Sequence, residues 1–146
     1  MSRENTIYAI YYSYVLHRIF SVITGRIDKV LTFCLLLLGS SVMASIGNPL
    51  FTGLCIATIA AVQNAFKFGA ECESSRVQAL RYVSLYTNVE DYDDKELLSQ
   101  HSSIQKHDST VWSSLETIAE YRTDMVLKGD SNIKMTTLEK ALGFFC

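Results

Sequence analysis

The stretch that decides the fold runs from residue 30 to residue 66 and reads VLTFCLLLLGSSVMASIGNPLFTGLCIATIAAVQNAF. It contains no Lys, Arg, Asp, Glu or His. Charged residues stand directly beside it, at Asp28 and Lys29 before it and at Lys67 after it. An uncharged segment of this length inside a short chain predicts insertion into a lipid bilayer.

Two apolar runs, 30–46 and 50–66, make up this stretch. At about 1.5 Å per residue, each run spans roughly 26 Å as a helix, close to the ~30 Å hydrocarbon core of a bilayer. The turn between them is Gly47-Asn48-Pro49, in which Gly and Asn tolerate left-handed backbone and Pro suits the first turn of a helix. The sequence therefore predicts two antiparallel spans. A buried hairpin in a soluble protein is the alternative, but 146 residues leave too little protein to cover it.

The flanking charges predict the orientation of the hairpin. Basic residues precede the first span and follow the second, whereas the turn is uncharged. They are Arg18, Arg26 and Lys29 on one side and Lys67, Arg76 and Arg81 on the other. By the positive-inside rule both termini lie in the cytoplasm. Arg26, Lys29 and Lys67 are expected to anchor the spans at the membrane surface.

The composition indicates an all-α protein with no bound cofactor. The single proline is Pro49, and few other residues would break a helix. Net charge is −2, which gives no basic signal for nucleic acid. The four cysteines, Cys34, Cys55, Cys72 and Cys146, show no CxxC spacing. We therefore expect free thiols and no metal site.

We divide the chain into three parts: residues 1–27, the hairpin of residues 28–68 and a cytoplasmic helical region of residues 69–146. The first part is an amphipathic helix rich in tyrosine, which either lies at the membrane interface or packs on the C-terminal region. The second span is expected to continue as one helix to about Tyr86, with a buried stripe of Ala70, Val77, Leu80 and Leu85.

Two further helices are predicted in the C-terminal region. The first covers about 94–105 and is capped by Asp93 or Asp94. The second covers about 109–127, with Asp108, Ser109 or Thr110 as its cap and Gly129 at its end. A short docking helix is the interpretation of the apolar tail.

Small and polar residues within the spans are the candidate functional residues. Gly53, Ala57, Ala60 and Ala61 form a seam at small-xxx-small spacing, which lets helices approach closely, within one hairpin or between copies. Candidate pore-lining residues are Ser41, Ser45, Gln63 and Asn64. Packing is the alternative role for them. Two spans cannot enclose a channel, so a pore requires a homo-oligomer.

No motif in the sequence indicates an enzyme. The histidines are His17, His101 and His107, and the last two are six residues apart, which does not put them on one helix face. No pattern places a nucleophile beside a base, and no nucleotide-binding or hydrolase motif occurs. We expect a protein that is not an enzyme.

A helix bearing Tyr and Arg leads into a short hairpin, and Phe66-Lys67-Phe68-Gly69-Ala70-Glu71 then leaves the second span. A C-terminal helical part follows. This layout resembles the SLATT domain family of bacterial conflict systems over about residues 5–127. The resemblance implies an effector of the bacterial inner membrane. Its trigger would be a separate sensor or nucleotide-synthesising partner, or the cytoplasmic helices themselves. The resemblance implies no catalytic residue.

The leading hypothesis is an oligomeric effector that forms a pore or disrupts the membrane in defence against phage. The alternative is an inner-membrane interaction protein without a pore, such as a phage superinfection-exclusion factor. Depolarisation after expression would favour the first hypothesis, and crosslinking to an entry protein without ion leakage would favour the second.

Overall fold

The computed structural model describes residues 2–43, 48–131, 133 and 136–144. In this part of the chain all regular structure is helical, which confirms the all-α prediction. The α-helices are α1 (Arg3–Met43), α2 (Pro49–Phe66), α3 (Phe68–Thr87), α4 (Asp94–Gln105), α5 (Glu116–Leu127) and α6 (Thr137–Phe144). Two short 3-10 turns, η1 (Val89–Asp91) and η2 (Ser113–Leu115), precede α4 and α5.

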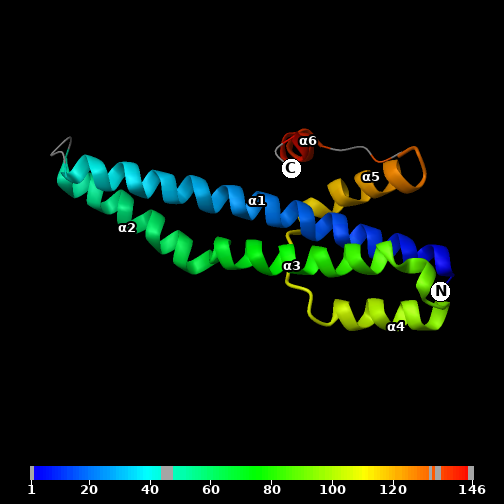
Figure 1. Cartoon of the computed structure of the whole chain (residues 1–146). Coiled ribbons are helices and arrows are strands. Elements are labelled where there is room, and N and C mark those ends of the chain that lie inside the picture. The colour runs from blue at the N-terminus through cyan, green and yellow to red at the C-terminus, as the bar shows by residue number, and fades with distance from the viewer. Residues whose placement is uncertain (1, 44–47, 132, 134–135, 145–146) are drawn as a thin grey trace.

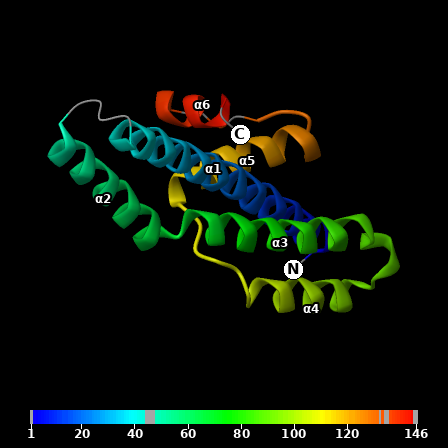
Figure 2. The same ribbon diagram turned by 60° about the vertical axis from the view of Figure 1, so that its left-hand side comes forward.

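The molecule has an extended hairpin at one end and a helical bundle at the other (Figure 1). α1 runs through both parts without interruption; its second half lies beside α2 and its first half beside α3. α4 lies beyond α3, and α5 packs on the opposite side of α1, as Figure 2 also shows. The N-terminus therefore lies at the end of the bundle farthest from the turn.

The hairpin leaves its large apolar side chains uncovered. Those more than half exposed include Val30, Phe33, Leu36, Leu37, Leu50, Phe51, Leu54 and Phe66. Within the described residues one helical stretch, inside Pro49–Thr87, is long and apolar enough to cross a membrane. This weakly indicates membrane association. The first span, predicted at 30–46, is not identified in this way, and part of it lies outside the described residues, so the two-span hairpin stays a prediction.

A single residue separates α2 from α3. Lys67 adopts the left-handed conformation, with φ of 47° and ψ of 42°, which costs a non-glycine residue about 1–2 kcal/mol. The sequence predicts one continuous helix here. That prediction is wrong because α2 must end before α3 can lie along α1 at a different angle (Figure 2). The Lys67 amide still donates to the carbonyl of Gln63 and closes the end of α2.

Two apolar clusters hold the bundle together. The first joins α1 to α5 and consists of Val15, Ile19, Phe20, Ile23, Leu115, Ile118 and Ala119. The second joins α1, α3 and α4 through Ile10, Tyr82, Leu85 and Leu97. Burial of both sets favours the interpretation of the first helix as one that packs on the C-terminal region.

Several local predictions are corrected by the bundle. Ala70, Val77 and Leu80 are exposed on α3, whereas Leu85 is buried as predicted. The predicted stripe is wrong at the three exposed positions, because the inner face carries Ser75, Gln78, Ala79 and Tyr82. α5 begins at Glu116 rather than at 109, and neither Asp108, Ser109 nor Thr110 caps it. In contrast α4 has the predicted bounds, and Asp93 accepts hydrogen bonds from the amides of Lys95 and Glu96.

Candidate functional site

The predicted seam lies on the outer face of α2. Gly53, Ala57, Ala60 and Ala61 are all exposed, and a Cβ added at Gly53 would meet no atom within 4 Å. The face toward α1 carries other residues, which are Thr52, Cys55, Ile56, Ile59, Val62 and Gln63. At 100° per residue the two sets are centred on different sides of the helix. The seam therefore does not pack the hairpin in this structure, and contact between copies stays a prediction.

The candidate pore-lining residues do not share one face. Gln63 is half-buried, and its Nε2 donates to Thr32 Oγ1 at 3.0 Å and to the Asp28 carbonyl at 3.5 Å, which ties α2 to α1. Ser41 donates to the Leu38 carbonyl of its own helix. Asn64 is exposed on the seam face, whereas Ser45 lies outside the described residues.

The three predicted anchors lie near the boundary between hairpin and bundle. Arg26, Lys29 and Lys67 are all exposed. α1 and α3 approach each other closely just inside this boundary, where a Cβ added at Gly25 would lie 2.8 Å from Cys72 Sγ.

A polar network of three buried side chains and the partly exposed Asp108 occupies the middle of the bundle. Asp108 accepts hydrogen bonds from Gln78 Nε2 and from the hydroxyl of Tyr82, both at 2.7 Å. His17 Nε2 lies 3.3 Å from the same carboxylate. Gln78 also donates to the Ile104 carbonyl at 2.8 Å. The network fixes the segment between α4 and α5 to both α1 and α3.

The histidines of this network are held in the neutral form. Burial lowers the pKa of His17, although Asp108 opposes this, and burial lowers the pKa of His101 in the same way. Both rings pack on Tyr82, with centroid distances of 5.8 and 5.9 Å. Burial and the hydrogen bond to Asp108 raise the pKa of the Tyr82 hydroxyl. His17 Nδ1 and His101 Nε2 are buried without a hydrogen-bond partner.

Sequence reasoning missed this network because its members are far apart in the chain. One signal was available: His17 lies among the apolar positions of the first helix, between Val15 and Ile19. A polar side chain on a buried face needs a partner, and Gln78 and Tyr82 are spaced four apart on α3, as two residues on one face must be. Their common acceptor, Asp108, was assigned instead to a helix cap.

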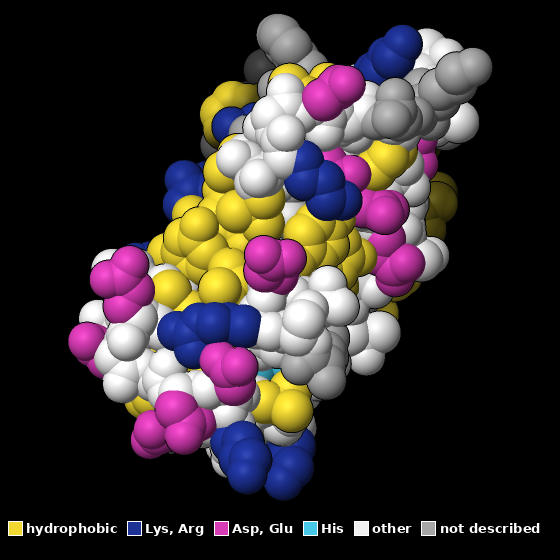
Figure 3. All heavy atoms as spheres, turned by 90° about the vertical axis from the view of Figure 1, so that its right-hand side faces the viewer, with side chains coloured by type: hydrophobic (Ala, Val, Ile, Leu, Met, Phe, Trp, Pro, Cys, Tyr) yellow, Lys and Arg dark blue, Asp and Glu magenta, His cyan; other side chains and the backbone are white. Residues whose placement is uncertain are grey.

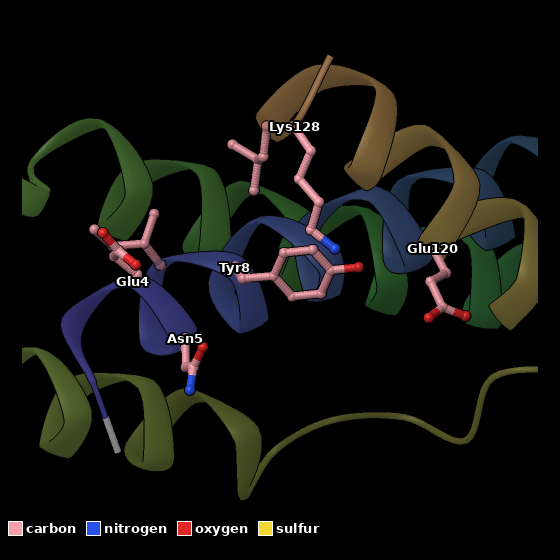
Figure 4. A pocket seen from close by; sticks show the side chains of 7 residues that line it. Glu4, Asn5, Tyr8, Glu120 and Lys128 are labelled. Carbon is pink, nitrogen blue, oxygen red and sulfur yellow. The ribbon is translucent and has the colours of Figure 1, made fainter. Parts of the chain in front are cut away.

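A second polar group lies at the far end of the bundle. The Tyr8 hydroxyl donates to Asp124 at 2.9 Å, and Lys128 Nζ lies 2.7 Å from the same carboxylate. Lys128 Nζ also lies over the Tyr8 ring, 4.8 Å from its centroid (Figure 4). Lys128 and Tyr8 lower the pKa of Asp124. The adjoining cavity of about 650 Å³ is lined by Tyr8 and Lys128 and also by Glu4.

Figure 3 looks onto this end and shows hydrophobic side chains gathered at its centre, with acidic and basic side chains around them. Opposite charges thus alternate around the face, and neither sign dominates it. Within the described residues no three His, Cys, Asp or Glu side chains are grouped closely enough to hold a metal ion.

The chain matches no protein-family model, no curated protein and no solved structure. The resemblance to the SLATT domain family therefore stays a prediction that rests on the arrangement of its helices.

Proposed function

We propose that this protein is an effector of the bacterial inner membrane, which oligomerises through α2 and forms a pore or disrupts the membrane during defence against phage. The observation that carries the proposal is the uncovered apolar surface of the hairpin. Exposed fractions of 83% at Leu50 and 66% at Leu36 are costly in water, since burial of such side chains stabilises by about 1.5–3 kcal/mol each. The charge pattern predicts that both termini lie in the cytoplasm.

The seam is the proposed contact between copies. Its residues are small and exposed, and they face away from α1, so a neighbouring hairpin can approach the backbone of α2 closely. Asn64 lies on the same face and would enter the assembly, whereas Gln63 is already bonded to α1. We therefore assign the polar lining of an assembled pore to Asn64 in preference to Gln63. A separate sensor or nucleotide-synthesising protein would supply the trigger.

Membrane potential and dye entry after induced expression test the proposal. Gly53→Leu places a large side chain on the seam and should reduce both depolarisation and crosslinked oligomers at least tenfold. Thr58→Leu is the matched control, because Thr58 is exposed on α2 but lies outside the seam face. If Gly53→Leu behaves like Thr58→Leu, the seam is not the contact.

An intact potential, together with crosslinking to a phage or host entry protein, would replace this proposal with the exclusion factor. Flotation of membranes and extraction at alkaline pH separately test insertion. A protein that alkali removes from the membrane would contradict both functions.

A further inference from the structure

A cavity of about 500 Å³ lies where the hairpin meets the bundle. It is bounded by α1, by the break between α2 and α3, and by the segment that leads into α5. The residues that matter to its chemistry are Phe20, Phe66, Phe68, Glu71, Asp108 and Trp112.

Aromatic rings form much of the wall. The rings of Phe66 and Phe68 are stacked across Lys67, with centroids 5.4 Å apart and an interplanar angle of 13°. Phe20 and Trp112 meet edge to face at 5.4 Å. Phe20 and Phe68 are buried, whereas Phe66 is 60% exposed. The faces of such rings attract cations, and a cluster of them is the usual receptor for an alkylated ammonium group.

The charged residues that line the cavity also favour a positively charged group. Two carboxylates, Glu71 and Asp108, line it, and no Lys or Arg is among the described residues that do so. Asp108 already accepts hydrogen bonds from the network of the bundle. The half-buried Glu71 side chain makes no hydrogen bond or ion pair with another described residue. Its carboxylate is therefore available to a ligand, and it favours a ligand that carries a positively charged group.

We propose that this cavity binds the ammonium group of an amine-headed phospholipid of the inner leaflet, such as phosphatidylethanolamine. The lipid assignment rests on the proposed insertion of the hairpin. Phe66 ends the exposed apolar surface of α2, so the cavity opens at the depth of the headgroups. A free organic amine has the same recognition chemistry and is the other source of such a cation.

Trp112 reports on occupancy because it is the single tryptophan of the chain and lines the cavity. Its emission is measured on the full chain in maltoside detergent during titration with short-chain phosphatidylethanolamine, with phosphatidylglycerol of the same chain length, and with tetramethylammonium. We expect a saturable change with phosphatidylethanolamine. Glu71→Gln removes the free carboxylate and should weaken this binding about tenfold. Glu73→Gln, on the exposed side of the same helix, should leave it unchanged.

Each outcome decides a separate point. If tetramethylammonium binds as tightly as phosphatidylethanolamine, the cation site stands and its lipid ligand is overturned. If neither phosphatidylethanolamine nor tetramethylammonium gives a saturable change, the site itself is overturned. The same holds if phosphatidylglycerol changes the emission equally and Glu71→Gln has no effect on binding. A matching circular dichroism spectrum shows that Glu71→Gln is folded. Because binding is measured in detergent and depolarisation in cells, failure of this inference is distinct from failure of the proposed function.

Discussion

Replacement of Asp108 by Ala tests the polar network that holds the bundle together. The change removes the acceptor of three donors, from Gln78, Tyr82 and His17. Gln78 keeps its bond to the Ile104 carbonyl, so two buried donors lose their partner. A buried donor without an acceptor costs about 1–3 kcal/mol. Because the Asp108 side chain is 25% exposed and water can reach the gap, we expect a loss of about 3 kcal/mol from the free energy of unfolding.

Guanidinium unfolding in maltoside, followed by the emission of Trp112, measures this loss. With an m value of about 3 kcal/mol per M, the midpoint should fall by about 1 M. Asp108→Asn keeps one acceptor oxygen and should give an intermediate midpoint. Asp91→Ala removes an exposed carboxylate on η1 and serves as the control. If Asp108→Ala unfolds within about 0.5 kcal/mol of the wild type, the network does not stabilise the bundle and the reasoning fails.

Two further predictions concern the same bundle. Acidification should destabilise it, because burial lowers the pKa of His17 and His101 from the ordinary 6.5, so the unfolded chain binds protons first as the pH falls. Stability is then lost from about pH 6.5 downward, by at most about 1.4 kcal/mol per pH unit for each histidine. The double variant His17→Gln/His101→Gln should flatten the dependence of the unfolding free energy on pH, measured by denaturant titration from pH 7.5 to 5. A denaturation midpoint that is constant over this range in the wild type would contradict this prediction. Gly25→Ala would place a Cβ 2.8 Å from Cys72 Sγ, so the thiol must rotate away and the gain of about 1 kcal/mol that Ala brings to a helix should be lost. Gly39→Ala, at a helical position with nothing within 4 Å, should be neutral or stabilising by up to about 1 kcal/mol, and equal melting temperatures of the two variants would exclude a close approach at Gly25.

The sequence predicted those features that depend on local chemistry. The uncharged stretch from 30 to 66 marked the extent of the exposed apolar surface, and the side chain of Asp93 marked the start of α4. Gly129, which has a positive φ of 76°, follows α5 by two residues as expected. Each of these signals lies within a few residues of the feature that it determines.

Features that depend on contacts between distant residues were not predictable in the same way. The break at Lys67 arises because α2 and α3 make different angles with α1. Position 67 is neither Gly nor Pro, so the sequence gives no local signal for a break there. The face of α3 that is buried depends on the acceptor that Asp108 offers to Gln78 and Tyr82 from about 26–30 residues away. The orientation of the seam likewise depends on which side of α2 meets α1. The four-residue spacing of small side chains does not indicate that side.

The uninterrupted course of α1 has a mechanical consequence. Its 41 residues form a rod of about 62 Å that extends from the far end of the bundle to the turn. The second arm of the hairpin, α2, is separated from α3 by Lys67 alone, and rotation about the two backbone angles of this residue changes the tilt of α2. A displacement of the bundle would therefore be transmitted to the tip of the hairpin by a stiff helix, while the angle between α2 and α3 can change at Lys67. The seam residues, which α2 carries on its outer side, would then move relative to α3.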